Sequence, residues 1–339
     1  MRSRMIRGGI AAMGILMLVL DSQTALLGAK DGIDLCIRSV VPSIFPFLVL
    51  SGMLTSALVG CDATMLRPLG RLIGIPKGTE ALFLTGTVGG YPIGAQTIHQ
   101  AWEKGQLSKK DAHRMLGFCC NAGPSFLFGI LGIQFTHRAY LWMLWAIHIF
   151  SALIVGIGLP STHSIEVKFE KSSVCTFPEA LKKAVHTMAI ICGWVIFFRV
   201  LLAFLDRWIL WIVPIAVKVT IHGFLELANG CCNLNLITSE GLRFVVASGM
   251  LGFGGICVYL QTLSVTGSLG AGQYLRGKCL QTVISIFSSI LLQFWLFPAS
   301  EKIQLNHSML ATFAILCILI VAIGLSWKKR GSIPALNGV

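Results

Sequence analysis

The segment 81–102 constrains the fold of this chain most strongly, because it is long enough to cross a bilayer and yet is broken at its centre. Its 22 residues include no Asp, Glu, Lys or Arg, and about 20 apolar residues suffice for a transmembrane helix. The sequence Gly-Gly-Tyr-Pro-Ile-Gly interrupts it at 89–94. Proline removes a backbone donor and glycine weakens a helix. The segment therefore predicts two short helices that form a hairpin.

The composition indicates a membrane protein. Of 339 residues, 55% are hydrophobic and 12% are charged, whereas a soluble domain carries about 25% charged residues. We therefore predict an all-α polytopic integral membrane protein, in contact with membrane lipid. The net charge of +13 does not predict a nucleic-acid partner, because the basic residues lie in short loops between apolar spans, where the positive-inside rule places them.

The apolar runs predict about eight transmembrane helices and two re-entrant hairpins. The predicted helices cover 8–28, 33–60, 114–135, 139–159, 184–205, 243–265, 278–297 and 308–327, and the hairpins cover 80–102 and 208–237. The N-terminus resembles a signal peptide, with Arg2, Arg4 and Arg7 before an apolar run, but it lacks an obvious small-x-small cleavage site. We favour an uncleaved first helix, with a signal peptide as the alternative.

Charge predicts the orientation. With both termini cytoplasmic, nineteen of the 27 Lys and Arg residues lie in the cytoplasm. The other eight are Lys30, Arg38, Arg138, Arg199, Arg207, Lys218, Arg243 and Lys302. A full crossing by 81–102 would move the basic cluster at 104–114 to the outer side and weaken this bias. The charge pattern therefore favours a hairpin with both ends in the cytoplasm.

The predicted elements repeat in the same order with opposite orientation, an arrangement that builds many secondary transporters. The predicted units are an N-terminal helix at 1–30, a first half at 31–160, a basic loop at 161–183, an inverted second half at 184–300, and a C-terminal helix with a basic tail at 301–339. Residues 110–114 and 239–243 open equivalent helices, which break near 120–126 and 252–255.

The second hairpin contains Glu226, the one acid that we place well inside the membrane. A charge at the bilayer centre costs about 2.5–3.5 kcal/mol on the insertion scale, so it is expected to face a cavity or a partner. Lys218 could pair with Glu226 or extend outward to water. An interfacial loop in which Glu226 contacts water is the alternative.

Other chemistry is not predicted. The eleven cysteines form no C-x-x-C pair and most lie in apolar runs, where free cysteine packs as a small hydrophobe. No zinc-protease or Walker motif occurs in the sequence. We therefore expect no metal, no cofactor and no enzymatic activity.

Three motifs carry a resemblance to a known family. Gly-Tyr-Pro-Ile-Gly-Ala at 90–95, Gly-x-Leu-Ser-x-x-Asp-Ala at 105–112 and Asn-Ala-Gly-Pro-Ser-Phe at 121–126 resemble the sporulation integral membrane proteins of the YlbJ type, also called SpoVV. That type belongs to the nucleoside-recognition, or Gate domain, superfamily. The resemblance covers roughly 30–300 and implies export of dipicolinic acid through the outer forespore membrane.

The resemblance also implies a substrate site. The implied residues are Gly90, Tyr91, Pro92, Gly94 and Ala95 at the hairpin tip and Asn121, Gly123, Pro124 and Ser125 at the helix break, with a looser match at Glu226, Asn229 and Gly230. Cys119 and Cys120 precede Asn121, where the family suggests more polar residues.

Broken helices offer unpaired N–H groups and positive dipole ends, which suit an anion. Tyr91 could stack on a pyridine ring, and Asn121 and Ser125 could bind a carboxylate. The alternatives are interfacial anchoring for Tyr91 and helix packing for the other two residues. His148 is expected to be a packed polar residue rather than a proton carrier. No clear buried Arg or Lys is expected in the site, so backbone N–H groups would hold a dianion.

The favoured function is therefore secondary transport of a small organic anion such as dipicolinate, with a homo-oligomer as one assembly. A nucleoside or other metabolite carrier and a non-transporting scaffold of the spore envelope are the alternatives. Two broken hairpins in inverted halves favour a carrier, since a scaffold does not need them.

Overall fold

The computed structural model describes residues 2–58, 64–160 and 175–297, and these ranges contain helices and connecting turns but no strand. The chain is an all-α polytopic membrane protein, as predicted. Five helices of the described ranges are long and apolar enough to cross a membrane: Ser22–Leu58, Arg138–Gly158, Phe177–Trp208, Glu240–Leu269 and Tyr274–Leu296.

The long helices expose large apolar side chains, as expected for contact with lipid. On α9 (Arg138–Gly158), Trp142, Phe150 and Ile157 are each more than half exposed, whereas Leu144 on the opposite face is buried. Such a continuous apolar surface would be unfavourable if it were exposed to water. The nine cysteines that the described ranges contain are unpaired and mostly buried, in agreement with a packing role.

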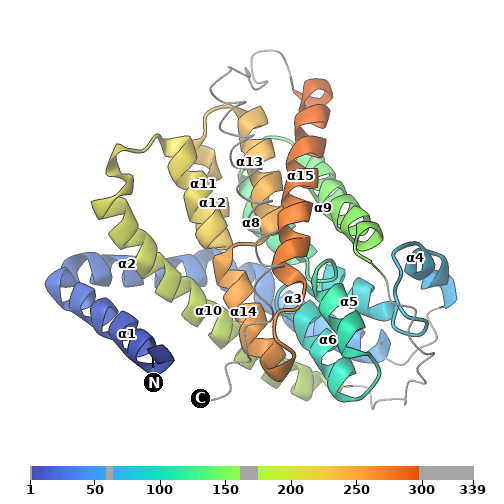
Figure 1. Cartoon of the computed structure of the whole chain (residues 1–339). Coiled ribbons are helices and arrows are strands. Elements are labelled where there is room, and N and C mark those ends of the chain that lie inside the picture. The colour runs from blue at the N-terminus through green and yellow to red at the C-terminus, as the bar shows by residue number, and fades with distance from the viewer. Residues whose placement is uncertain (1, 59–63, 161–174, 298–339) are drawn as a thin grey trace.

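The N-terminal helices differ from the prediction of two spans at 8–28 and 33–60. The helix α1 (Arg2–Leu20) ends before Asp21, and α2 (Ser22–Leu35), a π-helical turn and α3 (Val41–Leu58) form one continuous helix. Asp21 causes the break, because its carboxylate caps α2 by accepting the N–H of Thr24 at 3.3 Å. In Figure 1, α1 lies apart from the bundle at the lower left.

The first half contains the predicted hairpin. Its arms, α5 (Ala81–Gly89) and α6 (Ile93–Glu103), lie side by side in Figure 1, after the short helix α4 (Arg67–Leu72). The predicted helix at 114–135 breaks as expected near 120–126 and consists of two helices, α7 (Lys109–Leu116) and α8 (Pro124–Ile130), before α9. We call the non-helical residues 117–123 the first break; it includes the predicted Asn-Ala-Gly-Pro motif.

The second half repeats this order: a long helix, a hairpin, a broken helix and a long helix. These elements are α10 (Phe177–Trp208), α11 (Ile215–Leu225), α12 (Leu227–Cys232), α13 (Glu240–Phe253), α14 (Ile256–Thr266) and α15 (Tyr274–Leu296). Gly254 and Gly255 form the second break, with φ angles of +84° and +90° that favour glycine. The predicted helix at 308–327 and the loop residues 161–174 lie outside the described ranges.

The equivalent helices α7 and α13 begin at opposite ends of α9. Ser108 caps α7 and Ser239 caps α13 through the N–H groups three residues on. Arg114 of α7 donates to the carbonyls of Gly156 and Leu159, where α9 ends. Arg243 of α13 donates to the carbonyl of Gln134, just before α9 begins. The 21 residues of α9 extend about 31 Å, so α7 and α13 begin at ends of α9 that are this far apart. The two halves therefore run in opposite directions.

The long helices α2 and α10 pack closely and antiparallel. An ideal Cβ on Gly28 would lie 2.9 Å from Cβ of Ala203, and one on Gly32 would lie 2.9 Å from Cα of Ile196. Small residues at this spacing let transmembrane backbones approach each other. The pairing sets the C-terminal half of α3 beside the N-terminal half of α10.

The hairpin geometry predicts that Lys77 and Lys104, which are exposed and flank the hairpin, lie on one side of the membrane. Single cysteines at these positions, in a background without the native cysteines, should react with an impermeant thiol reagent from the cytoplasmic side only. A cysteine at Trp211, which is 73% exposed beyond the far end of α10, should react from the other side. Labelling of positions 77 and 104 from opposite sides would disprove the re-entrant hairpin.

Candidate substrate site between two hairpin tips

The two arms of the first hairpin cross each other at glycines. Glycines also bring the hairpin into contact with the first break. An ideal Cβ on Gly94 would lie 2.9 Å from Cα of Gly86 and 2.8 Å from the carbonyl oxygen of Cys119. At the tip, Gly90 has a φ of +73°, and its ideal Cβ would lie 2.8 Å from the backbone nitrogen of Gly123. Only glycine permits this approach of three backbone segments.

The second hairpin repeats the same construction. Its arms cross where Gly223 contacts Gly230, and Met250 of α13 packs against both. At the tip, the ideal Cβ of Gly255 would lie 3.3 Å from the backbone nitrogen of Leu227. Each hairpin tip therefore packs against the helix break of its own half.

A central cavity of about 50 Å³ lies between the two tips. Its lining includes five predicted site residues: Gly90, Tyr91, Gly123, Ser125 and Glu226. The other walls are Val40, Ile44, Gly89, Phe126, Ile191, Val195, Leu227, Ala228, Val258 and Gln261. This volume accommodates a few water molecules, so an aromatic ligand requires the hairpins to separate.

The other predicted site residues do not line the central cavity. Gly94, Ala95 and Gly230 pack within the hairpins, Pro92 follows a cis peptide bond and is the N-cap residue of α6, and Pro124 begins α8. The remaining two, Asn121 and Asn229, are buried and hydrogen-bonded. Their positions agree with structural roles that hold the tips in place.

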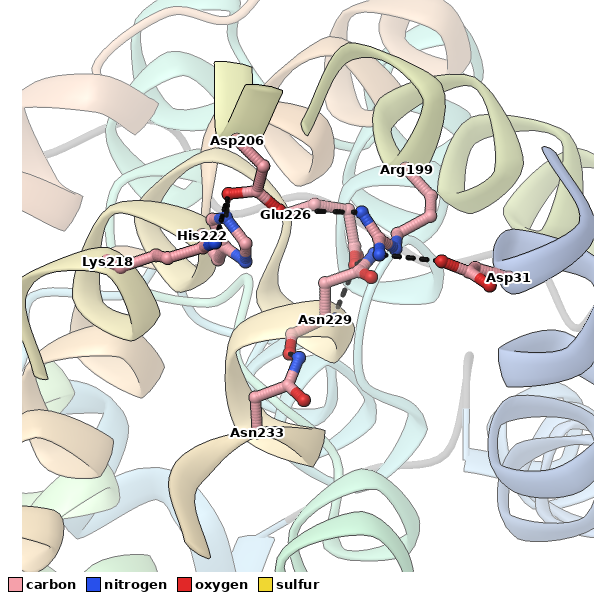
Figure 2. A network of polar contacts seen from close by, with 8 residues as sticks. All are labelled: Asp31, Arg199, Asp206, Lys218, His222, Glu226, Asn229 and Asn233. Atoms are coloured by element: carbon pink, nitrogen blue, oxygen red, sulfur yellow. Dashed lines mark hydrogen bonds and ion pairs between the residues drawn. The ribbon is translucent and has the colours of Figure 1, made fainter. Parts of the chain in front are cut away.

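Glu226 is buried, with 3% of its surface exposed, as expected for an acid that faces a cavity or a partner. Its carboxylate accepts the backbone N–H groups of Ala228 and Asn229 at 3.1 and 2.7 Å and the side-chain amide of Asn229 at 2.7 Å. Figure 2 shows this cap at the start of α12. The predicted pairing with Lys218 is wrong, because the Lys218 ammonium binds Asp206.

The expectation that the site has no buried cation is wrong as well. Lys278, assigned above to the cytoplasmic end of a span, is fully buried in the second turn of α15. Its ammonium donates to Gln281 Oε1 at 2.7 Å and to Asn121 Oδ1 at 3.4 Å. It also lies 5.3 Å from the ring centroid of Tyr91. A cation therefore lies directly behind a wall of the central cavity.

The polar residues around Lys278 form a network across the two halves. Gln281 donates to Asn121 Oδ1 and to the carbonyl of His148, and His148 Nε2 accepts the N–H of Ala122. This is the packing role expected for His148. The network ties α15 and α9 to the first break.

Helical spacing is the sequence signal that identifies Lys278. One face of α15 carries Lys278, Gln281, Thr282, Ser285, Ser289 and Gln293, all fully buried. The opposite face exposes Phe287, Leu291 and Trp295. In lipid, polar residues at helical spacing face the protein interior. The same spacing is visible in the sequence.

A separate polar cleft of about 440 Å³ lies beside α3, α6 and α10. Leu48 and Thr187 line the cleft one helical turn beyond Ile44 and Ile191 of the cavity. Its charged and amide residues are Lys104, Glu179, Lys183, Gln96, Gln100 and Gln106. The cleft lies on the side that the charge pattern predicts to be cytoplasmic.

Ion pairs join the helices on the opposite side. Asp206 of α10 binds Lys218 and His222 of α11 at 3.0 and 2.8 Å. Arg199 lies 3.9 Å from Asp206 and 2.7 Å from Asp31 of α2. We call these five residues the Asp206 cluster; in Figure 2 they lie beside the tip of the second hairpin. The cluster holds the first arm of this hairpin against α10.

The chain is similar in sequence to a known membrane protein. It is 28% identical over 170 residues to the sporulation integral membrane protein YlbJ of Bacillus subtilis (strain 168). The match covers 49% of this chain and 41% of the relative, so the chain matches less than half the length of that protein. No family model and no solved structure matches. The similarity supports the predicted YlbJ type, while the placement in the Gate domain superfamily stays a prediction.

Proposed function

We propose that this chain is a secondary transporter of a small organic anion, and that it exports dipicolinate through the outer forespore membrane during sporulation. One observation carries the proposal: both hairpin tips and the first helix break line a single cavity, and a polar cleft lies one helical turn beyond it. Broken helices in inverted halves are how many transporters build a substrate site.

The arrangement suits alternating access with the gate on one side closed. The cleft would admit a polar solute from the cytoplasm, while the Asp206 cluster closes the opposite side. The central cavity admits little more than water in this conformation, so transport requires hairpin movement. The similarity to YlbJ supports a role in sporulation, and the motif resemblance implies dipicolinate as cargo.

Purified protein in proteoliposomes tests the proposal. Labelled dipicolinate should cross faster than in empty vesicles, excess unlabelled dipicolinate should compete, and uridine should compete poorly. Transport of uridine but not dipicolinate would replace the proposal with a nucleoside carrier. If neither solute crosses under any imposed gradient, the scaffold alternative replaces it.

A further inference from the structure

Lys278 is a buried amine without an acidic partner in the described ranges. None of the ion pairs in the described ranges involves this residue. Its hydrogen-bond acceptors are the neutral amides of Gln281 and Asn121. A fully buried ammonium without an opposite charge is costly, so a counter-charge from outside the chain would lower its free energy.

The surroundings of Lys278 point toward the central cavity. Its ammonium lies 5.3 Å from the centre of the Tyr91 ring, and Tyr91 is one of the residues that line the cavity. A second ring, that of Tyr274, lies 5.8 Å away on the side of α15. The hydroxyl of Tyr91 is buried and has no hydrogen-bond partner within the described ranges. It is a free donor beside the second break, where it lies 2.8 Å from the ideal Cβ position of Gly254.

We propose that Lys278 is the counter-charge that makes this site select anions, through the ring of Tyr91. This inference rests on the proposed function and gives the site a charge preference. An anionic group in contact with the ring would lie within roughly 9 Å of the ammonium, since non-bonded contact adds about 3.5–4 Å. At an effective dielectric constant of about 20, Coulomb attraction over that distance raises the binding affinity by roughly a factor of 20 per unit of ligand charge.

The inference predicts an order of affinities that follows ligand charge. Pyridine-2,6-dicarboxylate should bind more tightly than pyridine-2-carboxylate, and both more tightly than the neutral pyridine-2,6-dicarboxamide. The three ligands share one ring, so the comparison isolates charge. Isothermal titration of the purified wild-type protein in detergent measures all three affinities.

Substitution of Lys278 then tests the residue. Lys278→Gln should weaken the affinity for the dianion by tenfold or more and change the affinity for the neutral diamide less than threefold. Lys278→Arg should retain the wild-type order of the three affinities. The matched control is Lys77→Gln, which removes an exposed lysine away from the cavity. Its affinities for the three ligands should equal those of the wild type. Size-exclusion chromatography checks that each variant is folded.

The outcomes separate the two proposals. If the dianion binds but its preference survives in Lys278→Gln, the role of Lys278 is wrong and the transport proposal stands. If that variant does not fold, the wild-type series decides: equal affinity for the dianion and the diamide overturns the inference. If wild type neither binds nor transports any of these ligands, the proposed function is wrong and the inference is overturned with it.

Discussion

Gly94→Leu should reduce transport of the proposed anion at least a hundredfold while the protein still reaches the membrane. Even a Cβ at this position would lie 2.9 Å from Cα of Gly86 and 2.8 Å from the carbonyl oxygen of Cys119. Backbone atoms cannot rotate away as a side chain can, so the hairpin must move from the first break. Overpacking of a tight interior costs about 1–3 kcal/mol or more, and the displaced tip no longer forms the wall of the central cavity.

Gly193→Leu is the matched control for Gly94→Leu. Gly193 also lies inside a helix, α10, but no atom lies within 4 Å of its ideal Cβ. This variant should transport at close to the wild-type rate. The measurement is the initial uptake rate in proteoliposomes, normalised to the inserted protein. Normal transport by Gly94→Leu would mean that the crossing of the first hairpin is not required for function.

Asp206→Asn should open the side of the protein opposite the polar cleft. The change leaves Lys218 and His222 of α11 without the carboxylate that binds them at 3.0 and 2.8 Å. The Lys218 and Asp206 side chains are 27% and 22% exposed, so removal of one partner costs less than the figure of about 3–5 kcal/mol for a fully buried pair. A loss of even about 2.8 kcal/mol from the closed state would raise the population of the open state about a hundredfold relative to it.

An accessibility measurement detects this opening. A cysteine at Ile44, which lines the central cavity, should react with an impermeant thiol reagent applied from the Asp206 side. The reaction should be much faster in Asp206→Asn than in a protein with Asp206 intact. The control is Asp34→Asn, which removes an exposed pair with Arg38 of a kind worth about 0–1 kcal/mol. Equal labelling rates in both variants would show that the Asp206 cluster is not a gate.

The breaks could be predicted from the sequence because their causes are local. Proline at position 92 and glycine at 90 disfavour a continuous helix wherever they occur. Gly254 and Gly255 break the second half for the same reason. Local causes also explain the wrong boundary at Asp21, because an acid between two apolar runs can end a span or, as here, cap the start of the next helix.

The residues around the site were harder to predict, because their roles depend on distant partners. Lys278 has the same local setting as a cation at the end of a span, and only the packing of α15 against the first break brings it to Asn121. Lys218 is eight residues from Glu226, so sequence distance alone allowed a pair with Glu226 or an outward extension to water. The fold decides for Asp206, which lies on another helix.

The sequence by itself therefore determined that this chain is a helical membrane protein, where its hairpins and helices break, and that its two halves run in opposite directions. Those properties follow from apolar length, backbone chemistry and the distribution of charge, which are all local or additive along the chain. Only the tertiary structure decided which polar groups meet: the buried Lys278 beside Tyr91, the Asp206 cluster and the shared cavity. These depend on helix rotation and packing, because a polar side chain in lipid must find its partner across helices, wherever that partner lies in the sequence.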